Sequence, residues 1–118
     1  MKTEPNAQML QIYFGEQDQW QRKPLYVALI EECVTLGIAG ATVCRGIAGF
    51  GTSSTIHRSS LWSFSKDAPI MVTIVDTPEQ IAKLTPSLQR MVTEGLVVRS
   101  SVQAVRYQRD TPPPSARE

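Results

Sequence analysis

The sequence is poor in the residues from which metal sites and catalytic centres are usually built. Its 118 residues include one histidine, His57, and two cysteines, Cys33 and Cys44, which are not spaced as CxxC. One histidine cannot supply a histidine-rich zinc site with three or four ligands. The chain also lacks a GxxxxGK[ST] phosphate loop and a GxGxxG turn at the start of a helix. We therefore expect no metal-binding residue, no catalytic residue and no enzymatic activity.

A large excess of charge and a long apolar run are also missing. The formal net charge of +1 argues against nucleic-acid binding, which needs a concentrated basic surface. No apolar run approaches the roughly 20 residues that span a bilayer, so we expect no membrane insertion. The first residues do not form the apolar stretch of a secretory signal. We expect a cytoplasmic protein whose two cysteines are reduced and lie in or near the core.

The composition that remains is that of an ordinary globular domain. Apolar residues make up 42% and charged residues 19%, and the length allows a single core. We expect a flexible lead over residues 1–7, one domain over residues 8–109 and a disordered proline-rich tail over residues 110–118. The tail contains Pro112-Pro113-Pro114, which cannot continue a strand or a helix.

The first half of the domain shows a change of hydrophobic period. Apolar residues alternate from Gln8 to Phe14, which predicts a strand. After a polar stretch, apolar residues recur at steps of four from Leu25 to Cys33, which predicts a helix with Gly37 as its C-terminal cap. Residues 41–47 predict a second strand.

The second half repeats this order. Residues 69–76 alternate as a third strand, and Thr77-Pro78-Glu79-Gln80 has the pattern of a helix capping box. The helix that follows contains Pro86, where we expect a kink or a break, and we expect it to end at Gly95. Residues 96–107 predict a last, irregular strand.

The resulting order βαββαβ predicts an α+β ferredoxin-like fold. Four strands form an antiparallel sheet, and both helices cover one face of it. The other face would carry Tyr13, Met71, Val75 and Val105, and is therefore rather apolar. Because an uncovered apolar sheet face usually has a partner, we expect another copy of the chain to cover it.

A glycine-rich stretch after the second strand is the strongest candidate for a ligand site. Arg45-Gly46 and Gly49-Phe50-Gly51 precede a run of hydroxyl residues that includes Ser53, Ser54, His57 and Arg58. Glycines allow a close approach of the backbone, and hydroxyl and guanidinium groups suit an anion such as a phosphate. The same composition is also typical of a plain hairpin loop, and that interpretation stays open.

Several short motifs along the chain together resemble the PII-like family catalogued as domain of unknown function 190. They are Lys23-Pro24-Leu25-Tyr26, Gly40-Ala41-Thr42-Val43, Arg45-Gly46, Gly49-Phe50-Gly51, Ile56-His57, Ile74-Val75-Asp76 and Glu94-Gly95-Leu96-Val97. That family is similar in fold to the PII signalling proteins and to CutA, whose ferredoxin-like subunits assemble as trimers. The resemblance implies a homotrimer that binds an adenine nucleotide (AMP, ADP or ATP) in clefts between subunits. It also implies control of a membrane transporter, a channel or an enzyme through the loop after the second strand.

The resemblance also implies roles for individual residues. The segment from Ile38 to Val43 is similar to the PII segment that contacts the adenine end of the nucleotide. Arg106, with Gln108 or Arg109 nearby, is similar to the basic pair that reaches the phosphates. Glu94-Gly95-Leu96-Val97 stands where PII proteins have a phosphate loop with glycine and lysine, which implies an anion other than a triphosphate.

The residue evidence and the resemblance together define one set of ligand-binding candidates. These are Thr42, Arg45, Gly46, Gly49, Phe50, Gly51, Ser53, Ser54, Arg58 and Arg106, with Lys23, His57 and Arg109 as a second group. The alternative is a ligand-free, CutA-like trimer whose loop recognises a protein or a metal ion. A small hydrolase or transferase is a remote third hypothesis, because no general base with a positioned partner is visible.

Overall fold

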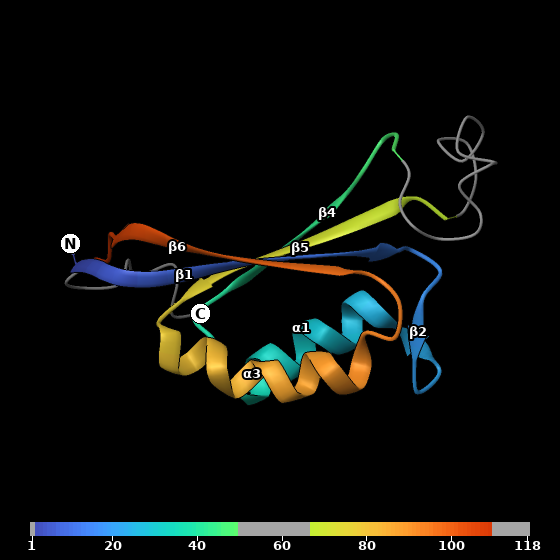
Figure 1. Ribbon diagram of the computed structural model, residues 1–118, viewed down its shortest axis with the longest axis horizontal. Coiled ribbons are helices and arrows are strands. Elements are labelled where there is room, and N and C mark those ends of the chain that lie inside the picture. Colours follow the sequence, from blue (N-terminus) through green and yellow to red (C-terminus); the bar gives the residue numbers. More distant parts are fainter. Residues whose placement is uncertain (1, 50–66, 110–118) are drawn as a thin grey trace.

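The described part of the protein consists of a four-stranded antiparallel sheet, one layer of two helices and a two-stranded hairpin. The computed structural model describes residues 2–49 and 67–109. The main sheet has the order β4-β5-β1-β6 and consists of β1 (Lys2–Gly15), β4 (Ala41–Arg45), β5 (Pro69–Asp76) and β6 (Leu96–Arg106). Helices α1 (Leu25–Thr35) and α3 (Pro78–Met91) lie on the same face of this sheet (Figure 1). The ferredoxin-like α+β fold expected from the sequence is thus confirmed.

The core lies between the helices and the sheet. β5 alternates between half-buried and fully buried residues along its whole length, because every second side chain points to the helices. Val72 of β5, Ile12 of β1 and Ile81 and Leu84 of α3 are among the most buried side chains. The same alternation in the sequence predicted the strand, and its bounds are those observed.

α3 begins, and α1 ends, where the flanking residues indicate. The Thr77 side chain accepts a hydrogen bond from the Gln80 N–H at 3.2 Å, which is the predicted N-cap of α3. Gly37 follows α1 with φ +76°, a conformation that glycine adopts without steric cost, and it acts as the predicted C-terminal cap. The Gln80 side chain donates to the carbonyls of Leu36 and Gly37, so α3 also holds the end of α1.

Three expectations about these elements are wrong, and one is narrowed. α3 is continuous through Pro86, which excludes the break expected there but leaves the kink untested, and it ends at Met91 rather than at Gly95. The second strand stops at Arg45, two residues earlier than the predicted Ile47. The first strand begins at Lys2, where the sequence predicted a flexible lead through residue 7.

Gly95 has a different role from the predicted helix end. A β-carbon at this position would clash with the Tyr13 carbonyl oxygen and would also press against the Val92 side chain. Glycine therefore allows the chain to pass close to β1 where it turns from α3 into β6. The close approach requires the fold of β1 beside β6, so sequence periodicity could not show it.

The polar stretch between β1 and α1 contains a small hairpin. β2 (Gln19–Trp20) pairs with β3 (Lys23–Pro24), and the two residues of the turn have positive φ values, 50° at Gln21 and 70° at Arg22. Two such residues are typical of a type I′ hairpin turn, which usually contains Asn or Gly. Because Gln and Arg lack that signal, the sequence did not predict the hairpin.

No described helix or strand covers the second face of the sheet. We call it the open sheet face; it carries Met9, Gln11, Tyr13, Met71, Thr73, Val75, Leu96 and Val98. Tyr13 is 36% exposed, Val98 38% and Leu96 58%. Within the described part of the chain, no helix is long and apolar enough to cross a membrane.

Candidate functional site

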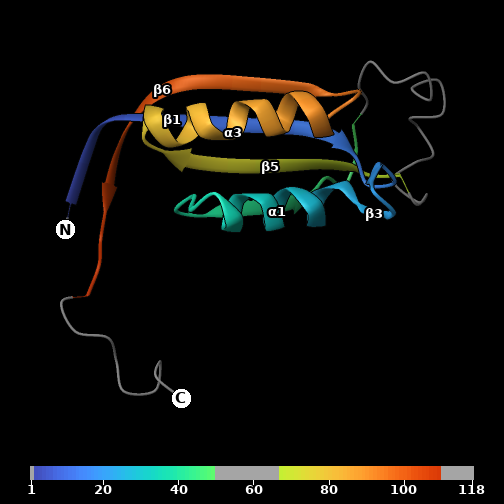
Figure 2. The same ribbon diagram turned by 90° about the horizontal axis from the view of Figure 1, so that it is seen from below.

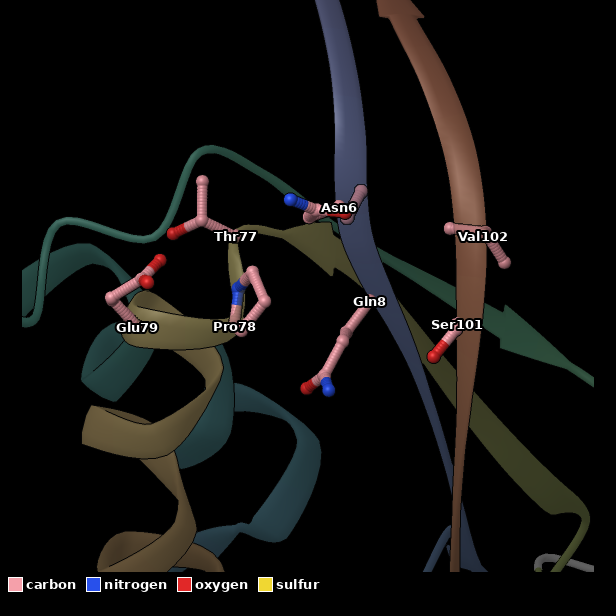
Figure 3. Close-up of a pocket in the computed structure, with 8 residues that line it drawn as sticks. Asn6, Gln8, Thr77, Pro78, Glu79, Ser101 and Val102 are labelled. Carbon is pink, nitrogen blue, oxygen red and sulfur yellow. The ribbon is translucent and has the colours of Figure 1, made fainter.

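Two hollows lie at the end of the sheet where β5 runs into α3. The first, which we call the helix hollow, has a volume of ≈ 490 Å³ and lies between the start of α3 and strands β1 and β6. Figure 3 shows that Gln8 extends towards α3 from β1, and that Ser101 faces it from β6. The lining residues are Asn6, Ala7, Gln8, Thr77, Pro78, Glu79, Ser101 and Val102.

The chemistry of the helix hollow does not suit an anion. Its lining contains a carboxylate, Glu79, and no lysine or arginine. The Thr77 hydroxyl already accepts the Gln80 N–H as the helix cap. An anionic ligand would therefore meet a like charge without a cation to balance it.

The second hollow combines a cation with hydroxyl groups. We call it the arm hollow; it has a volume of ≈ 560 Å³ and is lined by Ala7, Ala39, Gly40, Ala41, Thr42, Thr73, Val75, Asp76, Ala104, Val105 and Arg106. Thr42 on β4 pairs directly with Thr73 on β5, so both hydroxyls lie on the same face of the sheet. Arg106, at the end of β6, adds a guanidinium group, which binds carboxylates and phosphates well.

Small residues form most of the remaining wall of the arm hollow. Ala39, Gly40 and Ala41 come from the segment that enters β4, and Ala7 and Ala104 come from β1 and β6. Short side chains leave room for a flat group to lie against the backbone. The arm hollow therefore offers an apolar surface beside an anion-binding group.

Asp76 fixes one wall of the arm hollow. This residue is buried at the end of β5 with a relative exposure of 7%, and its Oδ2 accepts a hydrogen bond from the Ala39 N–H at 2.8 Å. Its Oδ1 accepts the Thr77 N–H at 2.7 Å. One carboxylate thus joins the segment before β4 to Thr77, the N-cap of α3, and both bonds are charge-assisted.

The structure separates the other described candidates from the arm hollow. Arg45, at the far end of β4, donates from Nε to the Glu16 carboxylate at 2.9 Å. The Gly46 N–H donates to the Pro69 carbonyl at 2.7 Å, and a β-carbon on Gly46 would lie 2.6 Å from Pro69 Cγ. Arg45 and Gly46 therefore fasten the end of β4 to its neighbours.

The remaining candidates lie elsewhere or outside the described residues. Lys23 forms an ion pair with Glu31 at 2.6 Å, and Gly49 and Arg109 are exposed. The last group of candidates falls in the part of the chain that the structure does not describe: Phe50, Gly51, Ser53, Ser54, His57 and Arg58.

Carboxylates gather at the opposite end of the sheet from the arm hollow. Burial raises the pKa of Asp18 above its ordinary value of 3.8; a hydrogen bond from the Gly15 N–H opposes this, and the nearby Asp67 and Glu94 carboxylates raise it further. Among residues 2–49 and 67–109, no three histidine, cysteine or acidic side chains are placed to hold a metal ion.

The two cysteines differ in their surroundings. Cys33 is buried under α1, and burial, followed by the charge of Glu32, raises the pKa of its thiol to about 11. Cys44 is exposed on β4, so the expectation that both cysteines lie in or near the core is wrong for this residue. Its position opposite Met71, on an edge strand, leaves it outside the core.

The resemblance had indicated the segment that contains Ala39, Gly40 and Ala41, but sequence reasoning missed Thr73, Ala7 and Ala104, which also line the arm hollow. Thr73 has no motif of its own, and only the register of β4 against β5 brings it beside Thr42. No sequence motif indicates Ala7 or Ala104 as part of a site either, since alanine is common in helices, strands and loops. Asp76 had two signals, its position just before a helix cap and its place in the motif Ile74-Val75-Asp76, and neither indicated the role that it has here.

Comparison with solved structures shows the same fold. The structure of CPII from Thiomonas intermedia K12 bound to ADP, AMP and acetate superposes with a TM-score of 0.63 at 18% identity, covering 90% of this chain and 94% of CPII. A putative PII-like signaling protein from Thermus thermophilus superposes with a TM-score of 0.60 at 17% identity, covering 89% of this chain and 94% of the other. At these identities the likeness shows the fold alone.

Comparison of sequences shows the family. A UPF0166 protein of Aquifex aeolicus (strain VF5) is 30% identical over 97 residues, which cover 82% of this chain and 91% of the relative. A UPF0166 protein of Methanocaldococcus jannaschii is 29% identical over 93 residues, covering 78% of this chain and 85% of the relative. Residues 7–104 match the family DUF190, described as “Uncharacterized ACR”. The chain therefore belongs to the DUF190 family, and its fold is that of the PII-like proteins.

Proposed function

We propose that the protein is a PII-like regulator that binds a small anionic effector in the arm hollow. The observation that carries this proposal is the meeting of Arg106 with the hydroxyls of Thr42 and Thr73 beside a wall of small residues. The guanidinium and hydroxyl groups suit an anionic group, and the small residues suit a flat ring. An adenine nucleotide (AMP, ADP or ATP) combines both features.

The fold neighbours support this choice of ligand class. CPII, a nitrogen regulatory PII-like protein, has been crystallised with ADP and AMP, together with acetate or with bicarbonate. Its fold matches that of this chain over most of both sequences. A nucleotide is therefore the first effector to test, and bicarbonate belongs in the same panel.

We also propose that the regulator is a homotrimer and not an enzyme. The open sheet face carries exposed Tyr13, Leu96 and Val98, an apolar surface that another subunit would cover. In such an assembly the effector would lie in a cleft between subunits. The segment after β4 would then control a membrane transporter, a channel or an enzyme, and the regulator itself would be cytoplasmic.

Titration calorimetry with AMP, ADP and ATP tests the proposal, after light scattering has given the molar mass. Arg106→Ala is expected to weaken binding roughly 10- to 100-fold, because a hydrogen bond to a charged group contributes about 1.5–3 kcal/mol. Arg99→Ala is the matched control, since Arg99 lies on the same strand but does not line the arm hollow. Its affinity should stay within about twofold of the wild type.

Two outcomes would contradict the proposal. Equal loss of affinity in both variants would mean that Arg106 has no specific role at the site. A trimer that binds none of the nucleotides, and no bicarbonate, would favour the ligand-free interaction module instead. A pull-down of protein partners would then be the next experiment.

A further inference from the structure

The first residues of the chain form a two-stranded arm with the last residues of β6. Lys2, Thr3 and Glu4 pair with Arg106, Val105 and Ala104, respectively. The register shifts between Glu4 and Ala7, which separates this pairing from the regular ladder that begins at Ala7. Figure 2 shows the start of β1 and the end of β6 turning away together from the body of the sheet.

The β6 side of this arm forms one wall of the arm hollow. Ala104, Val105 and Arg106 line it, whereas the opposite wall, including Thr42 and Thr73, belongs to the body of the sheet. The width of the arm hollow and the place of its guanidinium group therefore depend on where the arm lies.

Among the described residues, only the N-terminal strand pairs with this wall. β6 is an edge strand whose one neighbour in the sheet is β1, and residues 104–106 pair with residues 2–4 alone. A ribbon of two short strands is marginally stable without further packing. Residues 104–106 would thus lose their backbone hydrogen-bond partners if residues 2–4 detached.

We propose that residues 2–4 are a positioning segment for the effector: their backbone holds Arg106 and its neighbours at the arm hollow, and effector binding and arm pairing stabilise each other. This inference rests on the proposed function, because it takes the arm hollow as the effector site. The segment contacts β6 rather than the ligand, so it acts through Arg106. Because a chain with an unpaired arm does not bind, the apparent dissociation constant of the protein rises as the fraction of chains with a paired arm falls.

The test removes the backbone donors of the arm without removing the arm. The double variant Thr3→Pro/Glu4→Pro lacks two N–H groups, one of which faces β6 because donors alternate along a strand. The double variant Thr3→Ala/Glu4→Ala loses the same side chains and keeps both N–H groups. By calorimetry with ADP, the proline pair should bind about tenfold more weakly than the alanine pair, as expected when about a tenth of the chains have a paired arm.

A second comparison shows whether the effect passes through Arg106. In an Arg106→Ala background, adding the proline pair should change ADP affinity by less than about twofold, because the residue that the arm positions is gone. A tenfold loss in that background would overturn the inference. So would equal affinities of the proline and alanine pairs in the wild-type background.

The result also separates the inference from the proposed function. If the wild type binds ADP and Arg106→Ala binds it roughly 10- to 100-fold more weakly, but the proline pair binds like the alanine pair, the site stands and the positioning segment is refuted. If the wild type binds neither a nucleotide nor bicarbonate, both fall. If the proline pair does not fold, amide hydrogen exchange of the wild type decides: ADP should slow exchange at residues 2–4 and at 104–106, and slowing confined to residues 40–42 would overturn the inference.

Discussion

Replacement of Asp76 should destabilise the protein far more than the loss of one carboxylate usually does. The two carboxylate oxygens accept the N–H groups of Ala39 and Thr77 at 2.8 and 2.7 Å, and the residue is 7% exposed. In Asp76→Asn only the amide oxygen can accept, so one of the two N–H groups would face an NH₂ group. A hydrogen bond to a charged group contributes about 1.5–3 kcal/mol, and a buried donor left without an acceptor costs about as much.

We therefore expect Asp76→Asn to lower the free energy of unfolding by about 2–3 kcal/mol at pH 7. That is a large fraction of the roughly 5–15 kcal/mol that stabilises a typical domain. The assay is urea denaturation followed by circular dichroism, at one protein concentration for all variants, because assembly would make stability depend on concentration.

Glu79→Gln is the matched control for Asp76→Asn. It removes one negative charge from the exposed first turn of α3, where the helix dipole is worth about 0.3–1 kcal/mol. If Asp76→Asn costs no more than this control, the bridge between Ala39 and Thr77 does not stabilise the fold as reasoned. A loss of nucleotide affinity alone, without a loss of stability, would likewise refute the stability argument.

Two further predictions concern Asp18 and Cys33. Because the folded-state pKa of Asp18 lies above 3.8, its contribution to stability is present at low pH and is lost as pH rises through the folded-state pKa. Urea unfolding between pH 3 and 7 should therefore show the free energy of unfolding of Asp18→Asn rising relative to that of the wild type as pH rises. A difference between the two free energies that does not change with pH would contradict this. In a Cys44→Ser background, Cys33 should resist an alkylating reagent at pH 8. Its side chain is buried, and because its thiol has a pKa of about 11, only about one Cys33 in a thousand is a thiolate at that pH. Modification of the native variant as fast as in urea, measured by mass spectrometry, would refute that.

The regular parts of the fold could be predicted because their residues repeat with a clear period. The alternation from Pro69 to Asp76 gave a strand with the observed bounds, and Thr77 marked the start of α3. The end of α3 was predicted wrongly because glycine often ends a helix. Gly95 instead allows the backbone to pass close to the Tyr13 carbonyl oxygen. That contact joins residues far apart in the sequence.

The candidate site was only partly predictable. The resemblance to the PII-like family indicated Thr42 and Arg106, and the structure brings both to the arm hollow. The glycine-rich stretch also indicated Arg45, but this residue pairs with Glu16 at the other end of β4. Composition shows which side chains can bind an anion, and it does not show which of them meet.

The sequence alone determined the class of fold, the order of the two helices and of the four strands of the main sheet, and the family, because periodicity, caps and short motifs are local properties of the chain. Only the tertiary structure decided that residues 2–4 are strand and that Thr73 stands beside Thr42. The N-terminal residues have no alternation of their own, and their strand exists because residues 104–106 offer backbone hydrogen-bond partners. Strand register joins segments that are distant in sequence, and a hollow between such segments exists only once the register is set.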